Sequence, residues 1–534
     1  MSEITRDLDA AGEEPAAPAP PRQGVVATSQ PVAVDAALDV LRAGGNAVDA
    51  AVCAAAVLGV VEPMNTGLGG DCFALVWQAS ERRLLAYNGS GRSPAAASLD
   101  DLRRRGLSGV PQDGVLTITV PGALEAWHRL VERSGTRSLA DLLMPAARIA
   151  RDGFEVTPVV AGAWADMEAR LAREPAAADS FLPGGRAPRA GEWMRMPDMA
   201  RTFERIARDG IGALYGGALG GEVAAAVRAK DGWLAADDLA VHAGQWVEPL
   251  EGTYRGHPVW QMPPNDQGLV VLEALRILEE LPLGDLSAEE RTHVMIEAIK
   301  LAFADAFAHV ADPDAMRIDP AALLDDAFIM ARVDAIGDRA APRLQAGPVP
   351  SDTVYVTVVD AEGNACSLIN SLYMHFGSGV VVPGTGICLQ NRGALFSSEP
   401  GHPNALAPRK RPYHTIIPAM VFRGDEPWLV YGVVGGYQQP QAQAQILVDL
   451  IDVGMDLEAA VRAPRWRWIW DAMIQLEAGF DADVARGLEA RGHQCVDLPL
   501  PGGFGGAQAI LIDPDTGART GASDPRKDGK VGRT

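Results

Sequence analysis

The sequence has few cysteines, few lysines and no long apolar run. Its five cysteines form no C-x-x-C pair, and a sparse, odd count is typical of reduced, mostly buried thiols rather than a disulfide framework. The longest apolar run, residues 50–61, is shorter than the roughly 20 residues that a membrane-spanning helix needs. Residues 1–22 have neither the basic start nor the apolar core of a secretory signal. We therefore expect a cytoplasmic protein that does not contact a membrane.

Positive charge is also scarce. The 47 Lys and Arg residues stand against 69 Asp and Glu residues, which gives a net charge of −22. Nucleic acids and anionic membranes both bind through basic surfaces, so we expect neither as a partner. Hydrophobic residues make up 48% of the 534 residues, an ordinary value for a globular chain. Because a single hydrophobic core stops growing at about 250–300 residues, the length predicts either two domains or one large layered domain.

Familiar cofactor and metal motifs are missing as well. The sequence has no phosphate-binding P-loop, no H-E-x-x-H and no G-x-S-x-G, and its nine histidines show no ligand spacing. The glycine-rich runs at 67–70 and 502–506 lack the register of a dinucleotide-binding loop and predict tight turns. The sequence therefore predicts no metal site and no cofactor.

Helical and strand-like segments are segregated along the chain rather than strictly alternating. Residues 1–22 are acidic and rich in Ala and Pro and predict a disordered tail, and residues 334–352 predict a flexible connector. Periodicity predicts helices at 34–43, 46–60, 121–134, 138–152, 197–209, 267–280, 288–310, 440–453 and 480–491. It predicts strands at 73–77, 353–359, 365–372 and 507–513, and a strand pair around the turn 423–426. This order favours the α+β class with layered sheets.

One threonine stands directly after the connector, at the start of the strongest strand signal in the chain. If the bond between Asp352 and Thr353 were cut, the α-amine of Thr353 would have an unperturbed pKa of about 7.7–8.0. That amine could serve as general base for the hydroxyl of the same residue, which would supply nucleophile and base together. From spacing alone the alternative stays open, namely a threonine that simply starts a β-strand.

Ordered motifs over most of the chain narrow these alternatives. They are the segment 24–77 with GGNAVDAAV and GLGGDCF, VPGA at 120–123, MPP at 262–264, EAIKLAFAD at 297–305, Thr353 with VVDAEGN at 358–364, FGSGV at 376–380 and PGTG at 383–386. Together they resemble the γ-glutamyltransferase family of N-terminal-nucleophile hydrolases. The resemblance implies a four-layer αββα fold, within the α+β class, made from both fragments of a self-cleaved chain.

The resemblance also implies how the chain is divided. The cut would fall between Asp352 and Thr353, which gives a large-subunit part at 23–352 and a small-subunit part at 353–534. The two fragments would stay together as a heterodimer, and a dimer of such heterodimers is left open. Ser371 falls where the family has a hydroxyl residue bonded to the nucleophile.

The same resemblance assigns the oxyanion hole and raises a question about substrate. Gly435 and Gly436 fall where backbone N–H groups stabilise the oxyanion, and glycine lets a ligand approach the backbone closely. The acidic residue that holds the glutamyl α-amino group in the family falls at Leu395, and the family's Ser-Ser pair falls at His414 and Thr415. A buried ammonium without a carboxylate partner costs several kcal/mol. We therefore expect a small amide other than a γ-glutamyl compound, with water as the usual acceptor.

Further positions support a particular branch of the family. The segments 390–392 and 435–440 resemble the branch that contains oxamate amidohydrolase and cephalosporin-acylase-like enzymes. The position of the family's carboxylate-binding arginine is occupied by Ser90, and Arg92 follows two residues later. Substrate contacts are expected from Arg92, Tyr373, Asn391, Arg392, His414 and Thr415.

Alternatives remain for several of these residues and for the function. Arg92 and Arg392 could instead be surface residues or members of structural ion pairs, and His414 could be a satisfied core residue. An authentic γ-glutamyltransferase is the alternative activity, and an unprocessed protein that only binds a ligand is the alternative from a different class. Transfer of the acyl group to an amine also stays open.

Overall fold

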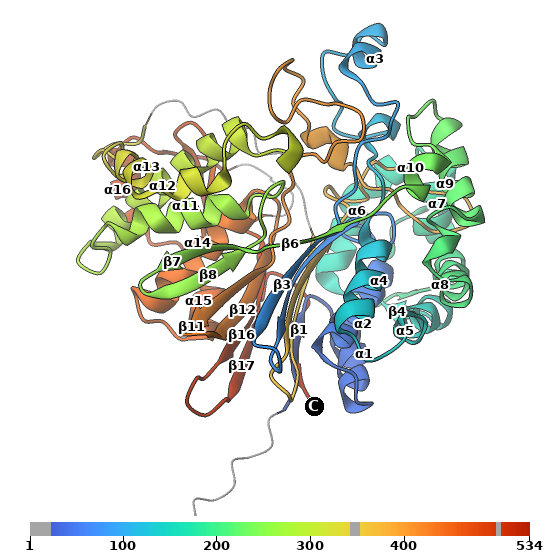
Figure 1. Cartoon of the computed structure of the whole chain (residues 1–534), viewed down its shortest axis with the longest axis horizontal. Coiled ribbons are helices and arrows are strands. Elements are labelled where there is room, and N and C mark those ends of the chain that lie inside the picture. Colours follow the sequence, from blue (N-terminus) through green and yellow to red (C-terminus); the bar gives the residue numbers. More distant parts are fainter. Residues whose placement is uncertain (1–22, 342–352, 498–502) are drawn as a thin grey trace, which may run out of the picture.

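Two antiparallel sheets form the centre of the protein (Figure 1). The structure, a computed structural model, describes residues 23–341, 353–497 and 503–534. The expected tail at 1–22, the end of the expected connector and Asp352 lie outside the described residues.

The first sheet has seven strands in the order β18-β1-β9-β10-β2-β3-β6. Every pairing in it is antiparallel. Its strands are β18 (Lys530–Arg533), β1 (Val25–Thr28), β9 (Val354–Val359), β10 (Ala365–Ser371), β2 (Asp71–Gln78), β3 (Arg83–Asn88) and β6 (Gln245–Val247). The hairpin β9–β10, which comes after residue 353, lies between β1 and β2, which come before it.

The second sheet has six strands in the order β17-β16-β12-β11-β8-β7, also antiparallel throughout. Its strands are β17 (Arg519–Ser523), β16 (Gly506–Ile512), β12 (Glu426–Val434), β11 (Ala419–Arg423), β8 (His257–Gln261) and β7 (Leu250–Tyr254). Both sheets therefore combine strands from the two sides of residue 353, and the chain forms one layered domain, the second of the two expectations from length.

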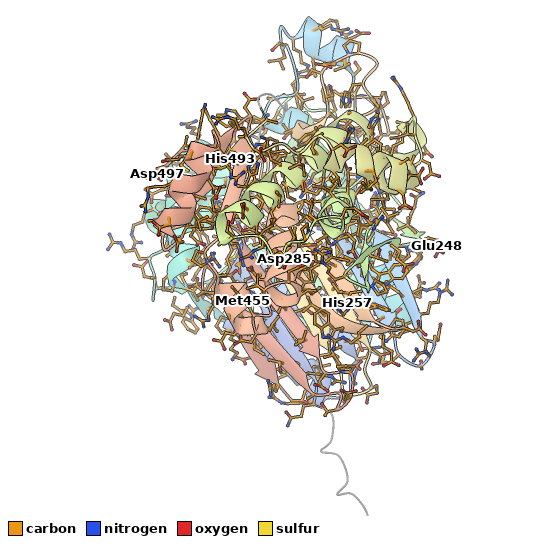
Figure 2. The ribbon with its side chains drawn as sticks, turned by 90° about the vertical axis from the view of Figure 1, so that its left-hand side faces the viewer. Glu248, His257, Asp285, Met455, His493 and Asp497 are labelled. Atoms are coloured by element: carbon orange, nitrogen blue, oxygen red, sulfur yellow. The ribbon has the colours of Figure 1, made fainter. Side chains whose placement is uncertain are left out.

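Helices cover the outer face of each sheet (Figure 1). The first sheet is covered by α1 (Pro31–Arg42), α2 (Ala47–Val61) and α4 (Ala123–Ser134), with α5 (Leu139–Asp152), α6 (Pro158–Leu171), α7 (Pro175–Phe181), α8 (Pro197–Asp209), α9 (Ala218–Arg228) and α10 (Ala236–Ala240) beyond them. The second is covered by α11 (Gly268–Glu279), α12 (Ala288–His309), α13 (Asp326–Val333), α14 (Gln438–Ile451), α15 (Leu457–Arg462) and α16 (Ala482–Ala490). Figure 2 views this second layer from outside, with His493 labelled beyond α16 and His257 labelled on β8. The αββα arrangement that the resemblance implied is confirmed.

Three apolar cores hold the four layers together. The central core joins the inner faces of the sheets, where Phe73, Tyr355 and Ile369 of the first sheet meet Met420 and Val430 of the second. The other two cores lie between each sheet and its helices. Because burial of apolar area is the main driving force of folding, a central core made from both halves of the chain joins them more strongly than surface contacts would.

Helix α2 explains the longest apolar run of the sequence. All of its 15 residues are buried, and Asn46 caps its first turn together with Asp49. Among the described residues no single helix is both long and apolar enough to cross a membrane. In the described ranges, one pair of helices meets those criteria jointly, Pro197–Asp209 with Ile211–Arg228, bent by 116°. All five cysteines are free, and four of them are buried, as their number predicted.

Candidate active site

Thr353 lies immediately before β9, in the middle of the first sheet, and is only 1% exposed. Its Oγ1 donates a hydrogen bond to Oγ of Ser371, at a distance of 3.1 Å. Ser371 is the last residue of the neighbouring strand β10, and its Oγ also accepts the backbone N–H of Tyr373 at 2.8 Å. The antiparallel β9–β10 hairpin therefore brings together the two hydroxyl groups that the sequence placed in one site.

Gly435 and Gly436 form the turn between β12 and α14. Their φ angles are +114° and +59°, a region that glycine adopts far more readily than other residues. Within the described part of the chain, the N–H groups of these two glycines donate no hydrogen bond. Nε2 of Gln267 donates to the carbonyl of Gly436 at 2.9 Å and to that of Thr415 at 2.7 Å, and so fixes the turn beside the 414–415 segment.

Arg392 is completely buried, at the start of the short turn Arg392–Leu395. Its Nη1 donates to Oγ1 of Thr415 at 2.7 Å, and its guanidinium lies over the ring of Tyr373, 4.7 Å from the centroid. Among the described residues its Nε and Nη2 have no hydrogen-bond partner, nor has the hydroxyl of Tyr373. Burial lowers the pKa of Arg392 to about 10, so the side chain remains a cation at neutral pH.

Asp71 and His414 form a buried pair beside this arginine. One oxygen of Asp71 accepts N–H groups from Gly91, Gly122 and Gln390, and its other oxygen accepts Nε2 of His414 at 3.1 Å. Burial raises the pKa of Asp71 to about 6, while the positive charge of Arg392 opposes that rise. Burial also lowers the pKa of His414 well below its usual value, so the ring is neutral.

The remaining contact of His414 limits what its ring can do. Its Nδ1 accepts the backbone N–H of Ile416 in a long contact of 3.4 Å. With both ring nitrogens engaged, His414 cannot take a proton from Thr353 without losing one of these bonds. The arrangement matches the satisfied core residue that the sequence left open, and a substrate contact of His414 stays a prediction.

Two further predicted contacts are engaged elsewhere. Arg92 donates to Asp312 at 2.8 Å and to the carbonyl of Arg409 at 3.2 Å, which is the structural ion pair left open for it. The amide of Asn391 donates to the carbonyl of Gln112 at 2.7 Å, and its Oδ1 accepts a backbone N–H from residue 374. Of the two arginines considered, only Arg392 is fully buried, and substrate roles for Arg92 and Asn391 stay predictions.

Sequence reasoning missed Asp71 and Gln267, which hold several site segments together. Asp71 and His414 are 343 residues apart in the chain, and no local pattern joins them. The signal available for Asp71 was its place directly after Gly69 and Gly70, at the start of a buried strand. Glycines allow close backbone approach, so an acid beside two of them in a buried strand marks a position where N–H groups converge.

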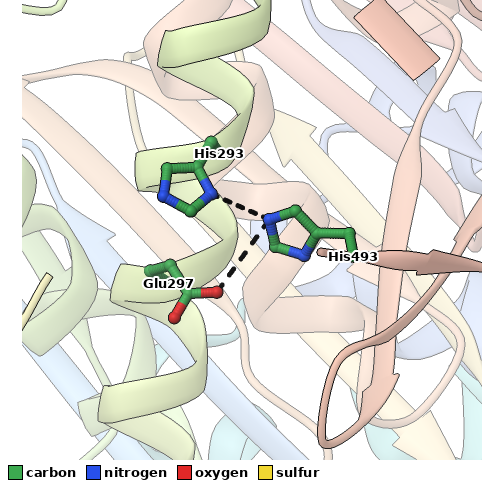
Figure 3. Close-up of side chains that lie close together, drawn as sticks. All are labelled: His293, Glu297 and His493. Atoms are coloured by element: carbon green, nitrogen blue, oxygen red, sulfur yellow. Dashed lines mark hydrogen bonds and ion pairs between the residues drawn. The ribbon is translucent and has the colours of Figure 1, made fainter. Parts of the chain in front are cut away.

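One group of side chains in the described residues has ligand atoms close enough to suggest a metal ion (Figure 3). His293 and Glu297 come from α12, and His493 follows α16. The two imidazoles are joined directly by a hydrogen bond of 2.8 Å between Nδ1 of His293 and Nε2 of His493. Nζ of Lys300 donates to Glu297 at 2.8 Å and balances its charge. A divalent cation here would have to replace the hydrogen bond between the two imidazoles, and in this structure the three residues and Lys300 form a hydrogen-bond network.

Comparison with known proteins covers almost the whole chain. The family described as gamma-glutamyltranspeptidase matches residues 33–534. A glutathione hydrolase-like YwrD proenzyme of Bacillus subtilis is 39% identical over an alignment of 505 residues, and the match covers 92% of this chain and 94% of the relative. An oxamate amidohydrolase proenzyme of Klebsiella pneumoniae is 36% identical over 520 residues, 95% of this chain and 97% of the relative.

A solved structure extends the likeness to the fold. The crystal structure of cephalosporin acylase from Bacillus halodurans matches with a TM-score of 0.92 and 41% identity, and the match covers 99% of each chain. Sequence and structure therefore agree over the same length. This chain belongs to the gamma-glutamyltranspeptidase family and is an amidohydrolase or acyltransferase.

Proposed function

We propose that this enzyme cuts its own chain between Asp352 and Thr353 and then hydrolyses small amides through an acyl-enzyme on Thr353. The observation that carries the proposal is the buried hydrogen bond from Thr353 Oγ1 to Ser371 Oγ, at the start of the central strand β9. A hydroxyl that is held by a second hydroxyl in a water-poor site has a fixed direction of attack, which lowers the entropic cost of the reaction.

Self-cleavage would follow from attack by the Thr353 hydroxyl on the preceding carbonyl. The Oγ–C bond forms and the C–N bond of the Asp352–Thr353 peptide breaks, while the hydroxyl proton moves to the departing nitrogen. Water then hydrolyses the resulting ester, which frees the carboxylate of Asp352 and regenerates the hydroxyl of Thr353. The new α-amine of Thr353 becomes the general base for the mature enzyme.

Turnover of an amide substrate would use the same groups. The α-amine of Thr353 takes the hydroxyl proton as Oγ1 attacks the substrate carbonyl, and it returns this proton to the leaving amine. The unused N–H groups of Gly435 and Gly436 suit the developing oxyanion, for which a single donor typically contributes ~2.7–4 kcal/mol. Water attacks the acyl-enzyme in the second half of the cycle, and an amine acceptor in its place would give transfer.

The fold supports a stable pair of fragments after the cut. Strands β9 and β10 of the second fragment lie between β1 and β2 of the first, and β11 pairs with β8 across the same division. Neither fragment contains all the strands of either central sheet. We infer that the mature enzyme is a heterodimer of the fragments that end at Asp352 and begin at Thr353.

Denaturing electrophoresis tests the proposal. Purified protein should give two bands, and Edman sequencing of the smaller should begin Thr-Val-Tyr-Val. Thr353→Ala should stay a single band without amidase activity. Thr357→Ala is the matched control, because Thr357 is another buried threonine of β9, whose hydroxyl donates to the carbonyl of Val430 at 3.2 Å. That variant should still be cut. An intact, active wild-type chain would overturn the assignment of Thr353.

A further inference from the structure

Arg392 presents an unexplained arrangement of charge. A fully buried guanidinium normally uses its five N–H groups on carboxylates, carbonyls or water, because leaving a charged donor unpaired in the interior costs more than leaving a neutral one. Here one nitrogen donates to Thr415, while Nε and Nη2 have no partner in the part of the chain that the structure describes. Among the described residues no carboxylate forms an ion pair with Arg392.

Another buried arginine in the same region shows what a purely structural role looks like. Arg411 is 1% exposed, and all three of its side-chain nitrogens are engaged, by carbonyls of Ser90 and Ala243 and by the side chain of Gln245. Arg467 also has two unpartnered groups, but its contact is with Gly503, next to residues 498–502, which lie outside the described ranges. Of these three buried arginines, Arg392 is therefore the one whose unpartnered donors are best explained by a ligand.

The two unused donors of Arg392 are on one edge of its guanidinium. Nε–H and Nη2–H point in parallel directions in any arginine, with the spacing of the two oxygens of a carboxylate, which is why such pairs are often bidentate. Asp71 is the carboxyl group whose charge acts on Arg392, and its oxygens already accept four N–H groups. Asp71 therefore stabilises the positive charge of Arg392 electrostatically, but it accepts no hydrogen bond from Nε or Nη2.

The position of Arg392 relates this edge to the proposed nucleophile. On one side the guanidinium lies over Tyr373, two residues beyond Ser371, which accepts the hydrogen bond of Thr353. On the other side it bonds to Thr415, whose carbonyl shares Gln267 with Gly436. The cation thus lies between the nucleophile segment and the glycine turn.

We infer that Arg392 binds a carboxylate in the acyl part of the substrate, so that the substrates are short acyl amides that end in a carboxylate. This inference rests on the proposed function, because the amide carbon must reach Thr353. It also predicts that an ammonium group near this point is rejected, since Leu395, in the same turn as Arg392, is apolar and offers no counter-charge.

A matched series of substrates tests the inference in the wild-type enzyme. Oxalyl-, succinyl- and glutaryl-p-nitroanilide each carry a terminal carboxylate, and the corresponding primary amides have the same shape without the charge. Loss of one partner of a buried ion pair typically costs ~3–5 kcal/mol, so kcat/KM should favour the best carboxylate substrate over its amide by ~10²–10³-fold. γ-Glutamyl-p-nitroanilide should be a poorer substrate than glutaryl-p-nitroanilide, from which it differs by the α-ammonium.

Variants then connect the preference to the residue. Arg392→Gln should bring the ratio of carboxylate to amide substrate close to 1, and Arg392→Lys should retain part of it, because a single ammonium cannot bind both oxygens in parallel. Arg205→Gln, which removes an arginine of α8 that pairs with Glu222, should keep the wild-type ratio. Leu395→Asp should narrow the gap between the γ-glutamyl and glutaryl substrates by giving the ammonium a partner.

The outcomes separate this inference from the proposed function. A cleaved enzyme that hydrolyses each carboxylate substrate and its amide equally well, or prefers γ-glutamyl-p-nitroanilide, would overturn the role of Arg392 and leave Thr353 catalysis standing. An uncleaved chain inactive on the whole series would overturn the proposed function itself. The wild-type comparison decides the question of Arg392 without any variant, so a misfolded Arg392→Gln protein would not obscure it.

Discussion

Replacing Ser371 by alanine separates its role in the reaction from its role in the fold. The hydroxyl accepts hydrogen bonds from Oγ1 of Thr353 at 3.1 Å and from the backbone N–H of Tyr373 at 2.8 Å, and all three residues are buried. Alanine removes this acceptor without adding bulk. The variant therefore loses the group that directs the nucleophile and leaves a buried N–H without that partner.

The two losses have different magnitudes. An unsatisfied buried donor costs about 1–3 kcal/mol of unfolding free energy. For a chain of this length the unfolding entropy is large, so the melting temperature should fall by only about 1–3 °C. A neutral hydrogen bond contributes about 0.5–1.5 kcal/mol, so loss of the bond to Thr353 should slow self-cleavage and amide hydrolysis by about 3–10-fold.

A second serine of the same strand provides the control. Ser367 is also fully buried in β10, and its hydroxyl bonds to that of Tyr355 at 2.6 Å and accepts the N–H of Ala419 at 3.1 Å. Ser367→Ala should lower the melting temperature by a similar amount, measured by fluorimetry, but should be cleaved at the wild-type rate on denaturing gels. If both variants slowed cleavage equally, or if Ser371→Ala slowed neither reaction, the reasoning about this hydroxyl would be wrong.

Three further predictions concern the surroundings of the site. Gly436→Val should lower kcat/KM of the cleaved enzyme by at least ~10²-fold, because φ is +59° there and a branched side chain would displace the backbone donors. Gly91→Ala should sharply lower soluble yield because its Cβ would overlap the carbonyl of Val120, whereas Gly221→Ala, in open space on α9, should raise the unfolding free energy by ~0.5–1 kcal/mol. Burial raises the pKa of Asp71 from 3.8 to about 6, so its contribution to stability is complete below about 3.8 and is lost as pH rises through about 6. Denaturant unfolding should therefore show that, between about pH 4 and pH 7, the unfolding free energy of the wild type falls relative to that of Asp71→Asn. A difference between the two unfolding free energies that stays constant with pH would contradict the raised pKa of Asp71.

Local patterns predicted most of the long helices, because their end signals are local, but they missed α6 and α9. Helix α5 begins after Ser138, which caps its first turn, and ends before Gly153, and both signals are visible in the sequence. The edge strands β18 and β6 were not predicted, because they are only four and three residues long and depend on partners far along the chain. A strand of that length has almost no periodicity of its own.

In the candidate active site too, the features that depend on nearby residues could be predicted from the sequence, and those that depend on distant residues could not. Thr353 and Ser371 come from one hairpin, and their hydroxyls are 3.1 Å apart, while their roles in catalysis stay predictions. Whether an arginine is a surface group or a buried cation depends on everything packed around it, so the sequence left Arg92 and Arg392 equivalent. The fold separates them, since Arg92 has a carboxylate partner and Arg392 lies fully buried without one among the residues of the described ranges.

The alternation of strands from both sides of residue 353 has a consequence for the lifetime of the enzyme. A cut before β9 would turn a unimolecular folding reaction into a bimolecular one, whose rate falls as the fragments are diluted. Each isolated fragment would expose open sheet edges and would aggregate faster than it finds its partner. The mature form would then persist through a slow rate of unfolding and not through a reversible equilibrium. Only the uncut precursor could unfold and refold repeatedly. A molecule of cut, active enzyme that unfolded once would not regain the native state.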